Sequence, residues 1–219
     1  MSRIIIFANG ELPNLQKASA LIKQDDFIIC ADGGTRHALA MGLTPHVIIG
    51  DMDSLPKNFS PFDNAQGKLS TFDGEVILYP KDKNETDLEL AINHAITLQP
   101  DEIIILGALG GRIDHTLANI SLLSTFQPFN LKLSDGIEEI SLCKHQLQVK
   151  GRSGDVISLI PYQGNVEGVT TQNLKWKLNN ETLFFNKTRG ISNEMTANVA
   201  TISITSGLLL IVHQISVVE

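Results

Sequence analysis

Residues 47–54 read Val-Ile-Ile-Gly-Asp-Met-Asp-Ser, an apolar run that ends in a glycine and two acids separated by one residue. A short run that is apolar throughout is typical of a strand buried on both faces, as in a parallel sheet covered by helices. In an extended segment the side chains of Asp51 and Asp53 point to the same side. The stretch therefore predicts both a class of fold and an acidic site where the strand ends.

The same ending occurs after two other apolar runs. Residues 28–34 read Ile-Ile-Cys-Ala-Asp-Gly-Gly, and residues 103–115 read Ile-Ile-Ile-Leu-Gly-Ala-Leu-Gly-Gly-Arg-Ile-Asp-His. Open parallel sheets bind ligands beyond the carboxyl ends of their strands, and glycines there let backbone N–H groups approach phosphate oxygens. A single ending of this kind would be explained by ordinary turn chemistry. Three together indicate one shared binding site.

The pattern of expected secondary structure changes along the chain. The first part alternates strand patterns with helical patterns, predicted over residues 14–24, 35–41, 86–98 and 113–126, with Asn14 and Thr86 as N-caps. After Pro128 only short strand patterns remain, at residues 131–133, 139–143, 146–149, 156–160, 174–178, 182–185, 199–205 and 208–213. We expect an α/β domain built on a parallel sheet over residues 1–127, followed by an antiparallel all-β domain, either a sandwich or an open barrel, over residues 128–219. Polar residues 55–74 are expected to form a long loop over one edge of the sheet.

Composition excludes several classes of function. The net charge is −7, and all of it belongs to residues 1–127, which hold 16 acidic and 9 basic residues. This balance argues against nucleic-acid or membrane-surface partners, which need basic patches. No apolar run approaches the roughly 20 residues that span a bilayer, and the first residues make a poor signal peptide. We expect Cys30 and Cys143 to be buried free thiols in a cytoplasmic protein.

The residue types at the strand ends favour one chemistry. Paired carboxylates such as Asp51 and Asp53, without sulfur or nitrogen ligands nearby, suit Mg²⁺, which shares phosphate oxygens with a nucleotide. Lys81 and Lys83 stand just before a predicted helix start, where the helix dipole disfavours a cation and a bound phosphate would explain one. The guanidinium of Arg112 has the fork geometry for a phosphate.

With these residues in place, the chain resembles the bacterial-type thiamine pyrophosphokinases. The matching motifs, in the family's order and at its spacing, are residues 31–34, 50–54, 86–91 and 110–115 in the first part, and 174–178 and 190–194 in the second. The resemblance covers nearly the whole chain, and the ordered set is far more specific than any one motif. One departure stands at Asn84, where the family commonly has an Asp; Asp82 and Glu85 are the neighbouring acids.

The resemblance implies an enzyme that transfers diphosphate from ATP, its co-substrate, to the hydroxyl of thiamine, giving AMP and thiamine diphosphate with Mg²⁺ as cofactor. It also implies that residues 1–127 form the α/β catalytic domain and that residues 128–219 form an all-β sandwich domain for thiamine binding and dimerisation. In the homodimer that it implies, each active site is shared between the catalytic domain of one subunit and the β domain of the other. The resemblance assigns metal binding to Asp51, Asp53 and Asp87. Asp32 either binds the metal or activates the hydroxyl.

The remaining roles follow the same motifs. Nucleotide binding is expected from Gly33, Gly34, Lys83, Thr86, Gly110, Gly111 and Arg112. Thiamine binding is expected from Asp114, His115, Trp176, Ser192 and Asn193. Asp114 orients either thiamine or the metal. A tryptophan is the best side chain for stacking on the cationic thiazolium or on the flat pyrimidine.

Two other readings of the same residues remain. An Asp-x-Asp at a strand end is also found in metal-dependent nucleotidyl- and glycosyl-transferases, although these do not require residues 110–115. A non-catalytic thiamine or nucleotide sensor would keep the fold, and Asn84 is compatible with it. Release of AMP with thiamine as acceptor separates all three.

Overall fold

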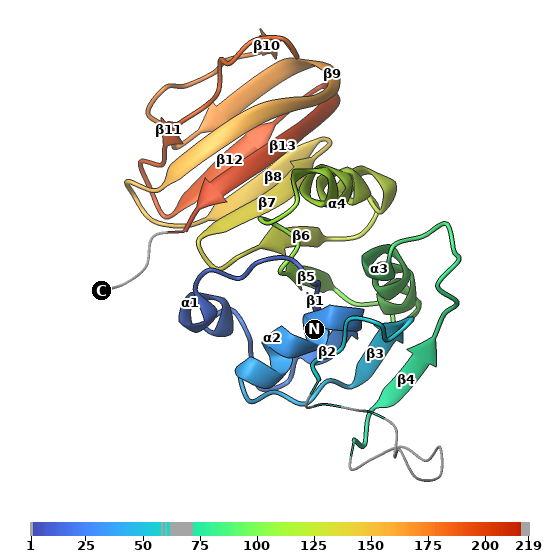
Figure 1. The fold of residues 1–219 in the computed structure, drawn as a ribbon. Helices are drawn as coiled ribbons and strands as arrows, with labels where there is room; N and C mark the ends of the chain where they lie inside the picture. Colours follow the sequence, from blue (N-terminus) through green and yellow to red (C-terminus); the bar gives the residue numbers. More distant parts are fainter. Residues whose placement is uncertain (1, 58, 60, 62–71, 216–219) are drawn as a thin grey trace. The chain divides into compact units, whose positions relative to one another are not determined.

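The computed structural model describes residues 2–57, 59, 61 and 72–215 (Figure 1). Most of the predicted loop over residues 55–74 lies outside the described residues. The chain divides into two compact units, Met1–Gly136 and Ile137–Glu219. In the described part of the chain, no helix is long and apolar enough to cross a membrane.

The first unit is built on a parallel sheet, as predicted. Its strands are β1 (Arg3–Phe7), β2 (Phe27–Ala31), β3 (Val47–Gly50), β4 (Glu75–Leu78), β5 (Glu102–Leu106) and β6 (Leu131–Ser134). Every pairing is parallel, in the order β4-β3-β2-β1-β5-β6. Strand β1 lies between β2 and β5 (Figure 1), so the order of the strands reverses there. Such a reversal opens a crevice for ligands at the carboxyl ends of the strands.

The helices of the first unit cover the sheet, which explains why its strands are apolar without interruption. They are α1 (Leu15–Ser19), the 3-10 helix η1 (Asp32–Gly34), α2 (Thr35–Ala40), α3 (Asp87–Thr97) and α4 (Ile113–Thr125). Ile5 and Phe7 of β1 belong to one buried cluster with Ala18 of α1 and Ala38 of α2. Helix α3 packs against β1, β2 and β3. Each large apolar side chain buried in this way contributes about 1.5–3 kcal/mol.

The two predicted N-caps are confirmed, but one helix is shorter than predicted. Asn14 accepts a hydrogen bond from Lys17 N at 2.9 Å, and Thr86 accepts one from Glu89 N at 3.2 Å. Helix α1 ends at Ser19 rather than near residue 24. After Ser19 the chain continues in two tighter turns, in which Leu21 N donates to Ala18 O at 3.1 Å and Ile22 N donates to Ser19 O at 3.0 Å.

One predicted strand belongs to a different sheet from the one expected. Residues 131–133 were grouped with the antiparallel half, but β6 pairs in parallel with β5, with Leu131 opposite Ile103. The first compact unit accordingly runs to Gly136, beyond the predicted boundary at residues 127 and 128. The local sequence pattern indicates that these residues form a strand. It does not show which strand lies beside them, and that neighbour decides whether the pairing is parallel or antiparallel.

The second unit is all-β and antiparallel. Its strands are β7 (Glu138–Cys143), β8 (Gln146–Lys150), β9 (Val156–Gln172), β10 (Glu181–Leu183), β11 (Asn193–Glu194), β12 (Val199–Ser203) and β13 (Ser206–Gln214). The long strand β9 pairs with β13 through residues 157–162 and with β12 through residues 170–172, so it connects these two strands. One buried cluster includes Ile157 and Val169 of β9, Ile202 of β12 and Leu209 of β13.

Residues 174–178 do not form the predicted strand. Only Leu174 makes a β-bridge, to Met195. Backbone hydrogen bonds hold Lys175 and Leu178, and a side chain holds Trp176 between them, as described below. Both cysteines are buried free thiols, as expected.

Candidate functional site

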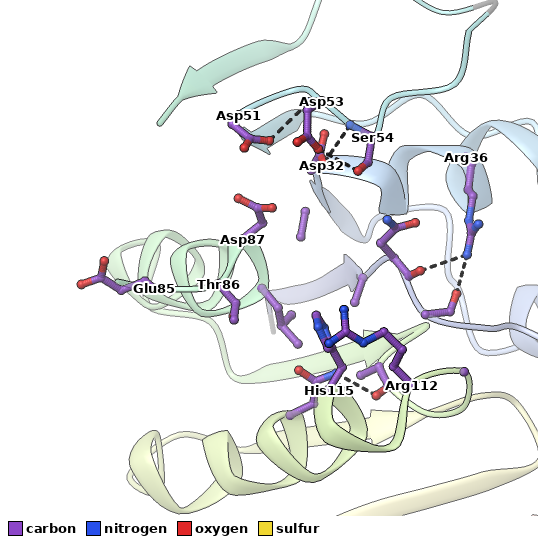
Figure 2. A pocket seen from close by; sticks show the side chains of 18 of the residues that line it. Asp32, Arg36, Asp51, Asp53, Ser54, Glu85, Thr86, Asp87, Arg112 and His115 are labelled. Atoms are coloured by element: carbon purple, nitrogen blue, oxygen red, sulfur yellow. Dashed lines mark hydrogen bonds between the residues drawn. The ribbon is translucent and has the colours of Figure 1, made fainter. Parts of the chain in front are cut away.

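A cavity of about 640 Å³ lies in the first unit, at the carboxyl ends of its strands. Its walls come from the residues that follow β1, β2, β3 and β5 and from the first turns of α3 and α4 (Figure 2). This is the position that a reversal in strand order predicts for a ligand crevice. Carboxylates gather on one side of the pocket, while Arg112 and His115 lie on another (Figure 2).

Three of the predicted carboxylates come together. Oxygens of Asp32, Asp51 and Asp53 all lie within 4.8 Å of one another. Asp32 begins η1 with φ 41° and is almost fully buried; its Oδ2 accepts from Ser54 N at 3.2 Å. Its buried Oδ1 has no hydrogen-bond partner among the described residues. Oxygen-only ligands with an unsatisfied buried oxygen fit a hard divalent cation such as Mg²⁺.

Electrostatics point the same way. Burial raises the pKa of Asp32, and the nearby carboxylates of Asp87 and Asp51 raise it further, although hydrogen bonds from Ser54 act against this. Clustered acids at this spacing repel one another unless a cation lies among them. The cluster is therefore a site where positive charge is favoured.

Asp87 stands at the first position of α3, outside the group of three. Its carboxylate pairs with Lys83, whose Nζ lies 3.0 Å from Asp87 Oδ1 and 4.0 Å from Asp51 Oδ2. Lys83 therefore bridges the two sides of the acidic wall. Beside Asn84, Glu85 lines the pocket, whereas Asp82 is not among the lining residues.

Lys81 binds the outer end of the cluster. Its Nζ lies 2.7 Å from Asp53 Oδ2. This hydrogen bond, with a second one from Ser54, lowers the pKa of the exposed Asp53. Asp53 is thus ionised at neutral pH and available to a cation.

The glycine pair and its neighbours form the opposite wall. Gly110 and Gly111 have φ values of 80° and 70°, a conformation that side chains rarely adopt and that exposes backbone N–H groups. Arg112 lines the pocket and donates to Asp114 with Nε and Nη2, the Nε distance being 3.1 Å. This pairing lowers the pKa of Asp114 to about 2. His115 lines the pocket, whereas Asp114 does not.

Gly33 and Gly34 are buried beneath the pocket rather than on its wall. A Cβ on Gly34 would lie 2.0 Å from Phe7 O, and one on Gly33 would lie 2.4 Å from the Asn9 side chain. Close packing against the end of β1 therefore explains why neither position has room for a side chain. Their expected role in phosphate binding stays a prediction.

Sequence reasoning missed the loop after β1. Asn9, Gly10 and Glu11 line the pocket, and so does Arg36 of α2. The guanidinium of Arg36 donates to Asn9 O at 3.0 Å and to Gly10 O at 2.8 Å, as Figure 2 shows. The rule of looking at strand ends, applied to residues 4–8, would have found the three loop residues. Nothing in the helical pattern of α2 singles out Arg36.

The remaining predicted site residues, Trp176, Ser192 and Asn193, belong to the second unit. Trp176 is 56% exposed, and Lys175 Nζ lies 5.0 Å from the centre of its ring. Asn193 is 4% exposed and is hydrogen-bonded to the backbone of Trp176. Ser192 has φ 55°, and its N–H donates to Ser158 Oγ at 3.0 Å. The structure thus brings these three residues together, with the indole facing solvent.

Comparison with known families matches both units separately. Residues 18–134 match the thiamin pyrophosphokinase catalytic domain. Residues 144–209 match the vitamin B1 binding domain of thiamin pyrophosphokinase.

Individual relatives agree over almost the full length. The chain is 29% identical to the thiamine pyrophosphokinase of Bacillus subtilis, over 97% of this chain and 99% of that protein. A crystal structure of the Bacillus subtilis enzyme superimposes with a TM-score of 0.84 at 27% identity, covering 99% of this chain and 100% of the other. The structure of thiamin pyrophosphokinase from Geobacillus thermodenitrificans also gives a TM-score of 0.84, at 27% identity and 98% coverage of both chains.

Proposed function

The chain belongs to the thiamine pyrophosphokinase family, whose catalytic domain matches residues 18–134, and we propose how its own residues carry out the transfer. It is an enzyme of this family, a transferase of the kinase type. A nucleotidyl- or glycosyl-transferase is not favoured, because the match extends over a second, vitamin B1 binding domain. A sensor without chemistry is not favoured either, since the curated relatives are named as enzymes.

The reaction we propose is transfer of a diphosphoryl group from ATP to thiamine. The hydroxyl oxygen of thiamine forms a bond to the β-phosphorus. The bond from that phosphorus to the oxygen bridging to the α-phosphate breaks, and AMP leaves with this oxygen. The hydroxyl proton passes to a pocket carboxylate. Catalysis of such transfers consists mainly of positioning and of neutralising charge on the transferring group.

The carboxylate cluster of Asp32, Asp51 and Asp53 carries the proposal. Mg²⁺ bound there would neutralise the phosphates of the nucleotide and polarise the transferring group. Its support is the convergence of three oxygens within 4.8 Å and the unsatisfied Asp32 Oδ1. Asp87 lies on the same acidic wall, joined to Asp51 through Lys83, and would complete the set expected from the family resemblance.

Cations and backbone donors of the pocket would hold the phosphates. Lys83 sits between Asp51 and Asp87 and can exchange a carboxylate for a phosphate oxygen without leaving the pocket. Gly110 and Gly111 offer backbone N–H groups, and Arg112 offers the fork that now engages Asp114. Thr86 contributes indirectly, since it caps the helix that begins at Asp87.

Thiamine recognition is proposed for the second unit. The ring of Trp176 is exposed and already has a cation, the Lys175 ammonium, 5.0 Å from its centre. A ring face that attracts an ammonium also attracts the cationic thiazolium. The resemblance to the family supports a homodimer in which one subunit supplies the carboxylates and the other supplies Trp176. The cytoplasmic location expected from the cysteines stays a prediction.

Coupled measurement of AMP release tests this function. The purified protein should release AMP from ATP with Mg²⁺ only when thiamine is added, one AMP for each thiamine diphosphate formed. A thiamine analogue without the hydroxyl should give none. Release of pyrophosphate instead of AMP, or AMP release independent of thiamine, would overturn the proposal.

A further inference from the structure

The segment around the single tryptophan is exposed at its centre and anchored at its ends. Leu174 and Leu178 are buried, whereas Trp176 between them is 56% exposed. Leu174 bridges to Met195, and Leu178 N donates to Thr171 Oγ1 at 2.9 Å. Backbone pairing reaches Lys175, whose N donates to Glu194 O at 2.9 Å, and resumes at Leu178, whose O accepts from Thr171 N at 3.0 Å. At Trp176 itself, a side chain supplies the hydrogen bonds to the backbone.

The side chain of Asn193 does this. Its Oδ1 accepts from Trp176 N at 3.1 Å, and its Nδ2 donates to Trp176 O at 2.7 Å. The same Oδ1 accepts from Glu194 N at 2.9 Å. One amide thus satisfies both backbone groups of Trp176, as a neighbouring strand would.

Asn193 is itself held rigidly. Its backbone pairs with Ile157 of the core strand β9, and its side chain is 4% exposed. Just before it, Ser192 N is bound by Ser158 Oγ. The amide therefore connects the β9 core to an exposed indole. Buried polar groups of this kind are expensive to leave unpaired and hold one geometry.

We propose that Asn193 is a positioning residue for thiamine, which acts by fixing the backbone of Trp176 and does not itself contact the substrate. The inference rests on the proposed function and revises the direct contact with the pyrimidine expected from the sequence. Its carboxamide oxygen already accepts two hydrogen bonds, so no acceptor remains for a ligand. An indole fixed in advance loses less conformational freedom when a ring stacks on it.

Steady-state kinetics of Asn193→Ala give the first test. We expect the KM for thiamine to rise about 10-fold, while kcat and the KM for ATP stay within about twofold of wild type. Asn165→Ala is the matched control, because Asn165 also holds a backbone N–H, that of Phe185, at 3.1 Å but does not contact Trp176. Suppose that the wild-type protein releases AMP in the presence of thiamine. An unchanged KM for thiamine in the Asn193→Ala protein would then overturn this inference but not the proposed function. A wild-type protein without thiamine-dependent AMP release would overturn the proposed function instead.

A double-mutant cycle separates positioning from direct contact. If Asn193 acts only through the indole, Asn193→Ala should add no further rise in KM to a protein that already carries Trp176→Ala. If it contacts thiamine directly, its effect should persist in that background, and the inference is wrong.

Fluorescence supplies a readout that does not need activity. Trp176 is the only tryptophan, so all indole emission reports this segment. Asn193→Ala should lower the anisotropy of the emission and raise its quenching by acrylamide, whereas Asn165→Ala should change neither. If the alanine variant does not fold, Asn193→Asp serves: its carboxylate keeps the acceptor and loses the Nδ2 donor to Trp176 O. Wild-type anisotropy in a folded Asn193→Asp protein would overturn the inference.

Discussion

At the scale of single residues, the acidic wall combines groups that would repel one another if they were alone. Asp32, Asp51 and Asp53 converge, and lysines already neutralise part of their charge: Lys81 pairs with Asp53 and Lys83 lies near Asp51. If the proposed cation site is correct, part of the net charge of −7 in residues 1–127 belongs to that site and does not serve solubility alone.

Neutralising one member of this cluster should abolish most activity. Asp51→Asn and Asp53→Asn each remove a hard anionic ligand while keeping the side chain's size. We expect kcat to fall by about 100-fold or more at saturating Mg²⁺, measured as AMP release with thiamine. Asp73→Asn is the matched control, because Asp73 is exposed and does not line the pocket. Near-normal turnover in both pocket variants would refute the metal assignment.

The sequence was sufficient to predict pocket residues that follow the apolar strands β2, β3 and β5, but the same rule was not applied to the loop after β1. Asp32, Asp51, Asp53, Gly110 and Gly111 were found in this way. Arg36 was not, because its placement depends on carbonyls of the loop after β1 and not on its own neighbours in the chain. For Asn193 the sequence predicted contact with thiamine, and it gave no sign of the hydrogen bond to the backbone 17 positions earlier in the chain. Long-range hydrogen bonds of this kind leave no local pattern.

At the scale of elements, helix α3 positions Asp87 and depends on its cap. Thr86→Ala removes the hydrogen bond to Glu89 N and should cost about 1 kcal/mol of unfolding free energy. Because the cap adjoins the pocket, we also expect lower activity, with Thr86→Ser restoring both. Asn14→Ala is the control: it removes the cap of α1 and should affect stability alone. Urea unfolding and AMP release together decide the outcome. Normal activity in a folded Thr86→Ala protein would show that the cap does not position Asp87.

A buried ion pair holds the opposite, amino-terminal end of the sheet. Arg3 donates to both carboxylate oxygens of Asp26, at 2.8 and 2.6 Å. Burial raises the pKa of Asp26, but the hydrogen bonds from Arg3 and from Lys23 N outweigh it and leave the pKa lowered. A carboxyl whose pKa is lower in the folded state stabilises the fold above its unfolded pKa, and this stabilisation is lost as the pH falls through the folded value.

Asp26→Asn should therefore destabilise the protein by about 3 kcal/mol at pH 7, because it leaves the mostly buried Arg3 without its counter-ion. The difference from wild type should begin to shrink below about pH 4, where Asp26 of the unfolded chain becomes protonated, and should disappear only below the lower pKa of the folded state. Urea denaturation at several pH values measures both effects. A destabilisation that does not change with pH would mean that packing, and not charge, is lost.

Elements show where tertiary contacts override local pattern. Residues 174–178 have the composition of a strand, yet the Asn193 amide takes the place of a neighbouring strand. Strand β6 was recognised, but its parallel partner was not. In each case the local propensity was read correctly, and a partner distant in sequence decided the structure.

At the scale of the whole molecule, the two matched domains carry different parts of the proposed chemistry. The first unit has the carboxylates and phosphate-binding groups, and the second has the exposed indole. In the proposed homodimer, each site combines the first unit of one subunit with the second unit of its partner. A symmetric dimer of this kind has two equivalent sites.

Subunit mixing tests this arrangement directly. Asp51→Asn and Trp176→Ala should each be nearly inactive at thiamine concentrations well below the KM of the Trp176→Ala protein. If equal amounts are unfolded, mixed and refolded, half of the dimers combine both variants, and each of these has one intact site. We expect recovery to about 25% of the wild-type activity. Refolding each variant alone is the control. If both functions came from one subunit, every site in the mixture would keep one defect, and no activity would return.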